Sequence, residues 1–432
     1  MRSQATAIDH EAVARLRREP IPPGTKALPL AGDELTPEAI AAAGWNVLDQ
    51  DLPFPLLTLH GPALEHNIVT MAEHCRRRGV LLAPHGKTTM APQIFERQIA
   101  AGCWALTAAT PTHLAVYRRF GIGRIFYANQ LVDRVALAWL ADELAADEQF
   151  EFFCLVDSAD GIERMDWLLG ARNPGRPVSV LIELGHPHGR TGCRSEGEAI
   201  ALAEKIRQTP TLRLAGVEAF EGTLPTADAT RAFLVSFRST VQALATAGHL
   251  DSDREALVSA GGSAYFDLVL DAFAELVEEH PNLVPLLRSG SYVTHDGGHY
   301  EESSPFGRRA EAGAPRLRQA LELWALVQSR PQPDLAILGA GKRDLPVDLG
   351  PPHLTRTWNE SRGFTSFDDH SSELAGISDQ HLHLTVDRDA PLRVGDLAAC
   401  AISHPCTAID KWRVIPVVDD DLTIVDAVRT FF

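Results

Sequence analysis

The fold of this chain is decided by one stretch of sequence, VSVLIELGHPHGRTGCRSEGEAIALAEKIRQTPTLRLAGVEA (178–219). It begins with a continuous apolar run at 178–184, passes through a polar loop, and then shows apolar residues three and four apart at 195–208. A second apolar run follows at 214–219. This order is typical of a strand, a helix and a second parallel strand. The stretch therefore predicts one unit of an α/β fold with a parallel sheet.

The same alternation continues on both sides of this unit, with eight short apolar runs in all. They are VLLA (80–83), WALTA (104–108), RIFYA (124–128), FFCLVD (152–157), VSVLIEL (178–184), LAGVEA (214–219), LVSA (257–260) and LVPLLRS (283–289). Amphipathic segments lie between most of them, which favours a (β/α)8 barrel of the TIM type. An open doubly wound sheet is the alternative.

The sequence changes character after about residue 310, where short alternating or β-branched runs are broken by Pro, Gly and Asp. This pattern predicts a second, mostly β domain at the C-terminal end. We therefore expect three parts, namely an N-terminal extension that packs on the β domain (1–54), the barrel (55–305) and the β domain (306–432).

Composition narrows the class of ligand. The 432 residues are 45% hydrophobic, and 40 Lys and Arg stand against 57 Asp and Glu, for a net charge of -17. This balance argues against nucleic acid or an anionic membrane as the main partner, so we expect a small molecule. No apolar run approaches the roughly 20 residues of a membrane helix, which predicts a soluble, cytoplasmic protein. The six cysteines form no CxxC pair, so no disulfide framework is expected.

The residues suited to chemistry fall in loops that follow the predicted strands. Barrel enzymes place their catalytic groups at this end of the strands and hold phosphate after the seventh and eighth. Glycine lets backbone N–H groups approach phosphate oxygens closely, and hydroxyl side chains add donors. The positions are Lys87 after the first strand, Arg190 after the fifth, Gly261, Gly262 and Ser263 after the seventh, and Gly290, Ser291 and Tyr292 after the eighth.

Lys87 follows an apolar strand and the turn formed by Pro84, His85 and Gly86. An ammonium group partly withdrawn from water in such a place loses its proton readily and acts as an imine-forming nucleophile. A solvated surface lysine is the alternative, and each glycine loop taken alone is an ordinary turn. A lysine, an arginine and two phosphate-type loops at one barrel mouth are together the parts of a pyridoxal phosphate site.

Eight motifs between about residues 55 and 410 are highly specific in combination. They are LEHNIVTMAEHCRRRGVLLAPHGKT (64–88), IELGHPHGRTG (182–192), VEAFEGT (217–223), VSAGGS (258–263), RSGSYV (288–293), LGAGKRDLPVDLG (338–350), ISDQHLHL (377–384) and SHPC (403–406). With these motifs the chain resembles the fold-type III pyridoxal phosphate enzymes. The resemblance is to the D-serine dehydratase and D-threonine aldolase family, which has an alanine racemase-like barrel.

The resemblance implies a role for each residue of the barrel mouth. Lys87 would hold pyridoxal phosphate as an internal aldimine, Arg190 would lie near the ring hydroxyl, and the loops 261–263 and 290–292 would hold the phosphate. We also count His85, in the turn that carries the lysine, as cofactor-binding. The chain departs from the family where GHPHGRTG replaces the more usual DTGxGRxG and where Phe220 stands in place of a common Tyr. Both departures bear on which substrate is accepted.

His404 and Cys406 stand two apart in AISHPCTAIDKWR, and in an extended segment their side chains would point to the same side. From the residues alone, a buried histidine beside a structural cysteine is the better interpretation, because zinc usually has three or four protein ligands. The resemblance favours the opposite interpretation. Family members that eliminate water resemble proteins that bind zinc through an HxC pair, whereas the aldolase members resemble proteins with HxD. We therefore expect zinc, or another divalent metal, at His404 and Cys406, with His370, His381 and His383 as further candidates.

The resemblance implies a dehydratase that converts a D-3-hydroxy amino acid, such as D-serine or D-threonine, to a 2-oxo acid and ammonia. Lys87 would take the Cα proton, and zinc would help the β-hydroxyl to leave. An aldolase that yields glycine and an aldehyde is the first alternative. A racemase would need a second base, for which we identify no residue, and the β domain counts against a pyridoxal phosphate carrier without turnover. The family also implies a homodimer with sites completed across the interface.

Overall fold

The computed structural model describes residues 5–32, 34–250, 253–368 and 372–432. These residues form two compact units, each continuous in space but assembled from three chain segments. The barrel unit contains the chain up to Asp9, Met71–Lys87 and Gln98–Gly290, and the β unit contains His10–Thr70, Thr88–Arg97 and Ser291–Phe432. Lys87 is therefore the last residue of one barrel segment, and Ser291 is the first residue of the long β segment.

The barrel unit is built on eight parallel strands in the order β2-β9-β8-β7-β6-β5-β4-β3. The strands are β2 (Leu81–Leu82), β3 (Leu106–Ala108), β4 (Arg124–Gln130), β5 (Glu151–Val156), β6 (Val178–Leu184), β7 (Leu212–Ala219), β8 (Ala256–Ala260) and β9 (Leu283–Leu287). Backbone hydrogen bonds from Trp104 N to Leu82 O (2.8 Å) and from Thr107 N to Pro84 O (2.9 Å) join the two ends of this order. The ring closes, so the predicted TIM barrel is confirmed and the open sheet is excluded.

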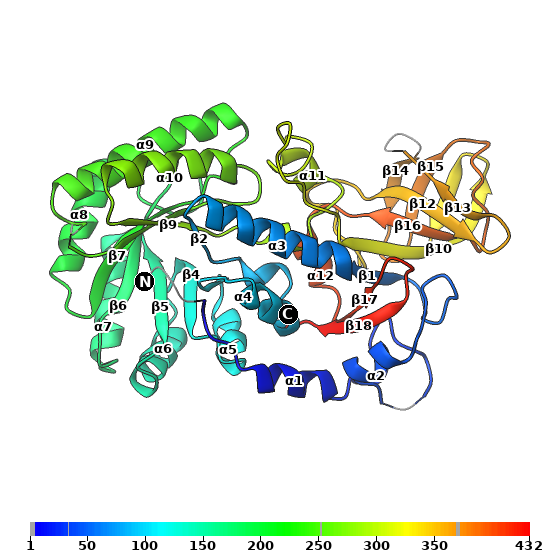
Figure 1. The fold of residues 1–432 in the computed structure, drawn as a ribbon, viewed down its shortest axis with the longest axis horizontal. Helices are drawn as coiled ribbons and strands as arrows, with labels where there is room; N and C mark the ends of the chain where they lie inside the picture. Colours follow the sequence, from blue (N-terminus) through cyan, green and yellow to red (C-terminus); the bar gives the residue numbers. More distant parts are fainter. Residues whose placement is uncertain (1–4, 33, 251–252, 369–371) are drawn as a thin grey trace. The chain divides into compact units, whose positions relative to one another are not determined.

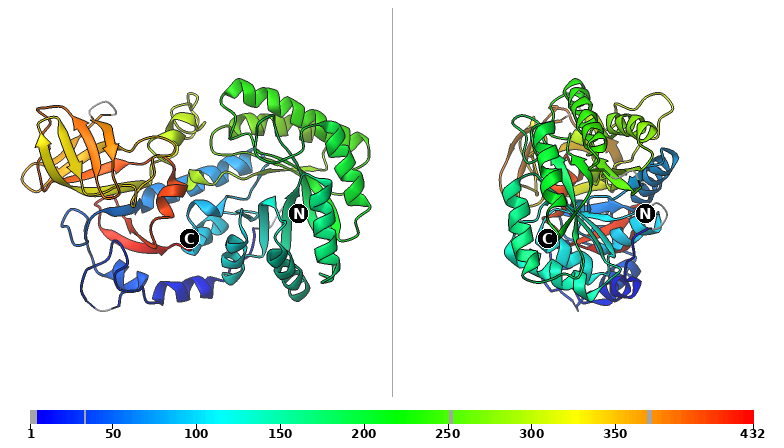
Figure 2. Two further views of the ribbon diagram at one scale, coloured as in Figure 1. Left: turned by 180° about the vertical axis from the view of Figure 1, so that it is seen from behind. Right: turned by 90° about the vertical axis from the view of Figure 1, so that its left-hand side faces the viewer.

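Helices cover the outside of the strands (Figures 1 and 2). They are α5 (Pro111–Arg119), α6 (Arg134–Ala146), α7 (Ala159–Gly170), α8 (Glu196–Arg207), α9 (Ala227–Thr246) and α10 (Phe266–Glu279), whereas α3 (Gly61–Arg77) and α4 (Pro92–Ala100) each have residues in both units. Helices α5 to α9 each begin after an N-cap residue whose side-chain oxygen accepts a backbone N–H of the first turn. These N-caps are Thr110, Asp133, Ser158, Ser195 and Thr226. Such caps fix where each loop ends and its helix begins.

The interior of the barrel is filled with side chains. One buried cluster contains Ala83, Trp104, Ala105, Phe126, Phe153, Leu155, Leu181, Ala215, Leu257, Val284 and Leu286, which come from all eight strands or the residues beside them. Filling of this kind makes a barrel a packed core with no open pore. A ligand must therefore bind at an end of the strands.

The β unit is built on ten strands, which confirms the predicted β-rich second domain. They are β1 (Leu56–His60), β10 (Leu321–Gln332), β11 (Leu335–Leu338), β12 (His353–Asn359), β13 (Gly363–Ser366), β14 (Ser372–Ile377), β15 (Leu382–Val386), β16 (Leu397–Ala401), β17 (Val414–Val418) and β18 (Ile424–Arg429). Seven follow the order β13-β12-β16-β10-β1-β17-β18, and β11, β15 and β14 extend the sheet from β10. The unit also holds α1 (His10–Arg18), α2 (Pro37–Ala42), α11 (His299–Ser303) and α12 (Pro405–Ile409).

The N-terminal part of the chain takes part in the β unit. Strand β1 lies between β10, to which it is antiparallel, and β17, to which it is parallel. Before it, Val47 N donates to Leu422 O at 3.1 Å, and the Arg17 guanidinium bonds the Asp426 carboxylate at 3.0 Å. These contacts tie residues far apart in the sequence to the same sheet.

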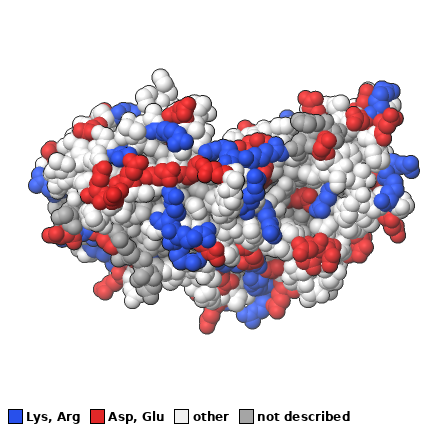
Figure 3. All heavy atoms as spheres, turned by 45° about the horizontal axis from the view of Figure 1, so that its top comes forward, with Lys and Arg blue, Asp and Glu red and all other residues white. Residues whose placement is uncertain are grey.

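The surface and the cysteines agree with the composition. Lysine and arginine lie among aspartate and glutamate on the face shown in Figure 3, and Arg238 on α9 pairs with Glu275 on α10. No disulfide joins any of the six cysteines, five of which are buried. Among the described residues, no helix has the length and apolar character needed to cross a membrane.

Candidate functional site

The turn that carries Lys87 is fixed to the barrel wall. Lys87 lies in the 3-10 turn η1 (Gly86–Thr88) after β2, and its side chain is exposed. Two residues earlier, His85 forms a parallel bridge with Thr107, whose Oγ1 donates to Ala83 O at 2.6 Å. The lysine therefore stands at the carboxyl end of the strands, where barrel enzymes place their chemistry. Its exposure differs from the partly desolvated ammonium expected from the sequence.

Two histidines beside Lys87 are held neutral. Burial is the largest cause that lowers the pKa of His85 well below 6.5, followed by the charges of Lys87, Arg288, His113 and Arg190. Burial and the charge of Lys87 likewise lower the pKa of His113 to about 4. The Nδ1 atom of His85 is buried and has no hydrogen-bond partner among the described residues. A neutral imidazole with a spare nitrogen is suited to contact a bound molecule.

Arg190 is presented by a loop that another arginine holds together. The guanidinium of Arg194 donates to the carbonyl oxygens of Thr191 at 2.6 Å, Gly189 at 3.2 Å and Arg190 at 3.3 Å. The Cζ atom of Arg190 itself lies 4.7 Å from the centre of the Phe220 ring. A planar guanidinium suits several acceptors at once, which an ammonium group does not. Arg194 was not singled out in the sequence, where only its position four residues after Arg190 could have indicated it.

A carboxylate accepts two backbone hydrogen bonds from the glycine turn after β8. Gly261 N and Gly262 N donate to the two carboxylate oxygens of Glu221, at 3.1 and 2.7 Å. A Cβ built on Gly261 would lie 2.1 Å from Leu287 Cδ1, and one on Gly262 would lie 3.1 Å from the Phe220 ring. Only glycine fits these positions without movement of a neighbour. Sequence reasoning found the glycines and missed Glu221.

A buried glutamate–arginine contact lies at the same end of the strands. Arg288, just after β9, donates to the Glu218 carboxylate, to Ala219 O at 3.1 Å and to Ser259 Oγ at 2.9 Å. Glu218 and Arg288 are 1% and 6% exposed. Burial raises the pKa of Glu218 to about 8, although the charge of Arg288 opposes this shift. The sequence signal was a charged residue directly after the apolar run of β9, within the motif RSGSYV.

The barrel unit thus brings together Lys87, His85 and Arg190, since the charges of the lysine and the arginine both act on the imidazole. Arg190 also acts on Glu218, as does Glu221, so the glycine turn belongs to the same neighbourhood. Two cations, Lys87 and Arg190, suit a small anionic ligand such as a phosphate monoester. Ser263 is half-buried beside this turn.

The remaining predicted residues lie in the β unit. Ser291 and Tyr292 are buried in the 3-10 turn η2 (Ser291–Val293). His404 has a left-handed backbone (φ 61°, ψ 77°) and precedes α12, in whose first turn Cys406 lies. The segment is therefore helical after His404, because Pro405 fits the first position of a helix. The extended arrangement considered from the sequence is absent here.

The His404 side chain nevertheless contacts Cys406. Its Nδ1 atom lies 2.5 Å from Asp348 Oδ2. Burial lowers the pKa of His404, but hydrogen bonding and charge from Cys406, and then from Asp348, outweigh it and raise the pKa above 6.5. The Cys406 sulfur lies 3.6 Å from Ser291 Oγ and 3.4 Å from Thr88 Oγ1. The turn into α12 thus forms a compact polar group around the thiol.

Two metal donors meet in this polar group. Across the part of the chain that the structure describes, no three His, Cys, Asp or Glu side chains are placed so that they could hold a metal ion. His381 is exposed, His383 lies 3.4 Å from Ser378 Oγ, and His370 lies outside the described residues. His404 and Cys406 are donors that zinc prefers, but a catalytic zinc normally has three protein ligands. The fit to zinc is therefore incomplete.

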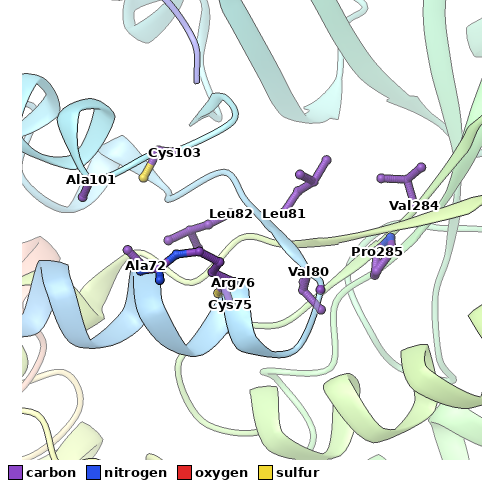
Figure 4. Close-up of a pocket in the computed structure, with 12 residues that line it drawn as sticks. Ala72, Cys75, Arg76, Val80, Leu81, Leu82, Ala101, Cys103, Val284 and Pro285 are labelled. Atoms are coloured by element: carbon purple, nitrogen blue, oxygen red, sulfur yellow. The ribbon is translucent and has the colours of Figure 1, made fainter. Parts of the chain in front are cut away.

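A cavity of about 440 Å³ lies at the opposite end of the barrel strands (Figure 4). Its lining comes from α3, the starts of β2 and β9 and the segment before β3, and includes Cys75, Arg76, Leu81, Cys103 and Val284. Burial raises the pKa of the Cys75 thiol to about 12, which favours its protonated form. The cavity is separate from the group around Lys87.

Two family models and a curated relative match this chain. The family model "Alanine racemase, N-terminal domain" matches residues 59–278, slightly more than half of the 432 residues. A serine dehydratase domain model matches residues 320–418. A D-threonine aldolase of Arthrobacter sp is 26% identical over 305 residues, which cover 69% of this chain and 74% of the relative.

Solved structures share the fold. A D-threonine aldolase from Filomicrobium marinum is 25% identical with a TM-score of 0.74, covering 90% of this chain and 97% of that one. A D-threo-3-hydroxyaspartate dehydratase from Delftia sp. HT23 is 19% identical with a TM-score of 0.67, covering 89% and 99%. Variants of such a dehydratase have also been solved, in which a histidine, or a cysteine two positions later, is replaced by alanine, the latter in a metal-free form.

Proposed function

We propose that this chain, which belongs to the alanine racemase N-terminal domain family of fold-type III pyridoxal phosphate enzymes, is a dehydratase for D-3-hydroxy amino acids. The broader class is a pyridoxal phosphate-dependent lyase acting on D-hydroxy amino acids, in line with its aldolase and dehydratase relatives. The proposed products are a 2-oxo acid and ammonia. The observation that carries the choice of dehydratase is the contact between His404 and Cys406.

The barrel mouth fits pyridoxal phosphate on its own chemistry. It supplies an exposed amine at Lys87, a buried ring nitrogen of His85 that lacks a partner among the described residues, and a turn that a Cβ would fill. We assign Lys87 to the aldehyde, His85 and Arg190 to the ring, and the loops 261–263 and 290–292 to the phosphate. When bound, the cofactor supplies an electron-withdrawing ring that stabilises negative charge at Cα.

The side chains of this chain then have distinct tasks. The amine of Lys87, once released by the substrate amine, accepts the proton from Cα of the amino acid. The neutral imidazoles of His85 and His113 leave Lys87 and Arg190 as the nearby cations, so the positive charge is concentrated on groups that attract phosphate and carboxylate. The Arg194 guanidinium bonds the carbonyl groups of the Arg190 loop and so supports it.

Metal dependence is a second part of the proposal. His404 and Cys406 match in spacing the histidine and cysteine replaced in the solved dehydratase variants, one of which is metal-free. The imidazole and thiol together suit zinc, and a third ligand would have to come from outside the donor group described above. Because that fit is incomplete, no step of the reaction is assigned to the metal.

An aldolase is the second candidate, because the aldolase relatives have the higher sequence identity to this chain. The Arthrobacter and Filomicrobium D-threonine aldolases, at 26% and 25% identity, exceed the 19% of the dehydratase. An aldolase would cleave the Cα–Cβ bond to give glycine and an aldehyde. The two candidates share the barrel mouth, so the products distinguish them.

The test is product analysis on D-serine, D-threonine and D-3-hydroxyaspartate, with and without a chelator. We expect 2-oxo acid and ammonia from wild type. Cys406→Ala should abolish elimination and lower bound zinc while cofactor absorption persists, because Lys87 is unchanged; of the assigned cofactor residues, Ser291 contacts the thiol. Cys400→Ala, which alters a buried thiol of β16, is the matched control and should keep the wild-type products. Glycine as the main wild-type product would establish the aldolase instead.

A further inference from the structure

The carboxylate of Glu221 occupies the two backbone donors that the glycine turn offers. Glu221 is fully buried, and its two oxygens each accept one N–H, from Gly261 and from Gly262. Bonds from N–H groups to an ionised carboxylate are among the stronger hydrogen bonds in proteins. Each amide carries a single proton, so neither is free for a second anion while Glu221 holds it.

The carbonyl side of the same turn is held as well. Ser289 Oγ donates to Gly262 O at 2.7 Å and lies 3.3 Å from Gly261 O. Gly261 has φ +95°, a backbone conformation that other residues rarely adopt. Both faces of the Gly261–Gly262 peptide are therefore engaged by side chains from the neighbouring loops, one after β7 and one after β9.

We infer that Glu221 is a positioning residue for the phosphate of the cofactor. It holds the Gly261–Gly262 turn by both amides, and Ser263 becomes the first residue of this loop that can donate to a phosphate monoester. The Phe220 ring lies 3.1 Å from a Cβ built on Gly262, so it packs against the turn. This inference rests on the proposed function, because it names the phosphate of that cofactor as the ligand.

The test compares two ligands that differ only in the phosphate group. Glu221→Gln preserves the size of the side chain but places an NH₂ donor against a backbone N–H, which leaves one amide unsatisfied. Cofactor-depleted protein is titrated with pyridoxal 5'-phosphate and, separately, with pyridoxal, and binding is followed by absorbance. The variant should bind pyridoxal phosphate about tenfold more weakly than wild type. Its affinity for pyridoxal should change less than about twofold, because the amine and ring contacts remain.

A second variant and a control make the result specific. Ser289→Ala loosens the carbonyl side of the turn. It should lower the ratio of the affinity for pyridoxal phosphate to the affinity for pyridoxal, by a smaller factor than Glu221→Gln does. Glu183→Gln alters another buried carboxylate, which bonds Gln130 and Thr191 and does not touch the turn, so the ratio should stay at the wild-type value.

An unchanged ratio in Glu221→Gln would overturn the inference and leave the proposed function standing. Tighter binding of pyridoxal phosphate in that variant would also overturn it, since Glu221 would then compete with the phosphate for the two amides. A wild-type protein that binds neither compound would overturn the proposed function, and this inference with it.

Discussion

The carboxylate of Asp296 accepts a hydrogen bond from the backbone N–H of His404, with 3.1 Å between Oδ2 and N. Its other oxygen accepts from Gly298 N at 3.0 Å and Tyr300 N at 2.8 Å, at the start of α11. Asp296 is 1% exposed. One buried carboxylate thus holds both the left-handed residue before α12 and the first turn of another helix, so it links the two loops.

Asp296→Asn should loosen the turn before α12, and so weaken the zinc binding proposed for His404 and Cys406, without affecting cofactor binding. The amide keeps one acceptor oxygen and loses the other, which releases either His404 or α11. We expect zinc affinity and elimination rate to fall about tenfold while bound pyridoxal phosphate stays at the wild-type level. Metal analysis and absorption spectra on one sample check this, with the exposed Asp389→Asn as control. Full zinc content in a slow variant would contradict the proposed role.

Borohydride should attach the cofactor to Lys87. The purified protein is expected to be yellow, and mass spectrometry of the reduced protein should find the label on the peptide that contains this residue. Lys87→Ala should take up no label and lose about 10³-fold or more in rate. Lys205→Ala, which removes only a surface ion pair with Glu163, should behave as wild type. A label on any other residue would refute the assignment.

Gly262→Val should weaken cofactor binding more than folding. Its Cβ would lie 3.1 Å from the Phe220 ring and 3.4 Å from Glu221 Oε1, so the side chain presses on both and disturbs the turn. We expect the affinity for pyridoxal phosphate to fall at least tenfold. The Tm should fall by only about 2–4 °C. Gly197→Val is the control, because a Cβ there meets nothing within 4 Å. Normal affinity in a folded Gly262→Val variant would place the phosphate elsewhere.

Glu218 should make stability fall as the pH rises. Its pKa is raised from 4.5 to about 8, mainly by burial, so between these values the folded state binds the proton more strongly than the unfolded state. Stability contributed by the protonated form is present below about pH 4.5 and is lost as the pH approaches 8. Thermal melts from pH 5 to 8 should show a shallower decline for Glu218→Gln than for wild type. Parallel declines would show that Glu218 is ionised throughout this range.

The strands and helices of the barrel were predictable because each is a local pattern. Runs such as VSVLIEL are apolar throughout, as buried parallel strands require, and capped helices follow them. The pairing of β1 between β10 and β17 was not predictable, because it joins segments more than 260 residues apart through backbone bonds that carry no residue signature.

The candidate site was predictable only in part. Lysine, arginine and glycine in the loops after strands can be recognised in the sequence by residue type and position. Glu218, Glu221 and Arg194 act through partners distant in sequence or through backbone carbonyls, which a single sequence does not reveal. Pro405 did carry a local signal for the helix after His404, and the extended interpretation of SHPC overlooked it.

The bonds that complete the barrel ring come from the residues just before the lysine. Pro84 O accepts from Thr107 N, and Leu82 O accepts from Trp104 N. A molecule that binds only the folded chain adds to its stability by mass action, and one attached at Lys87 does so next to this seam. Slower hydrogen–deuterium exchange at the Trp104 and Thr107 amides is therefore expected on cofactor loading. Exchange at these two amides would therefore show whether the cofactor is attached to Lys87, with no substrate present.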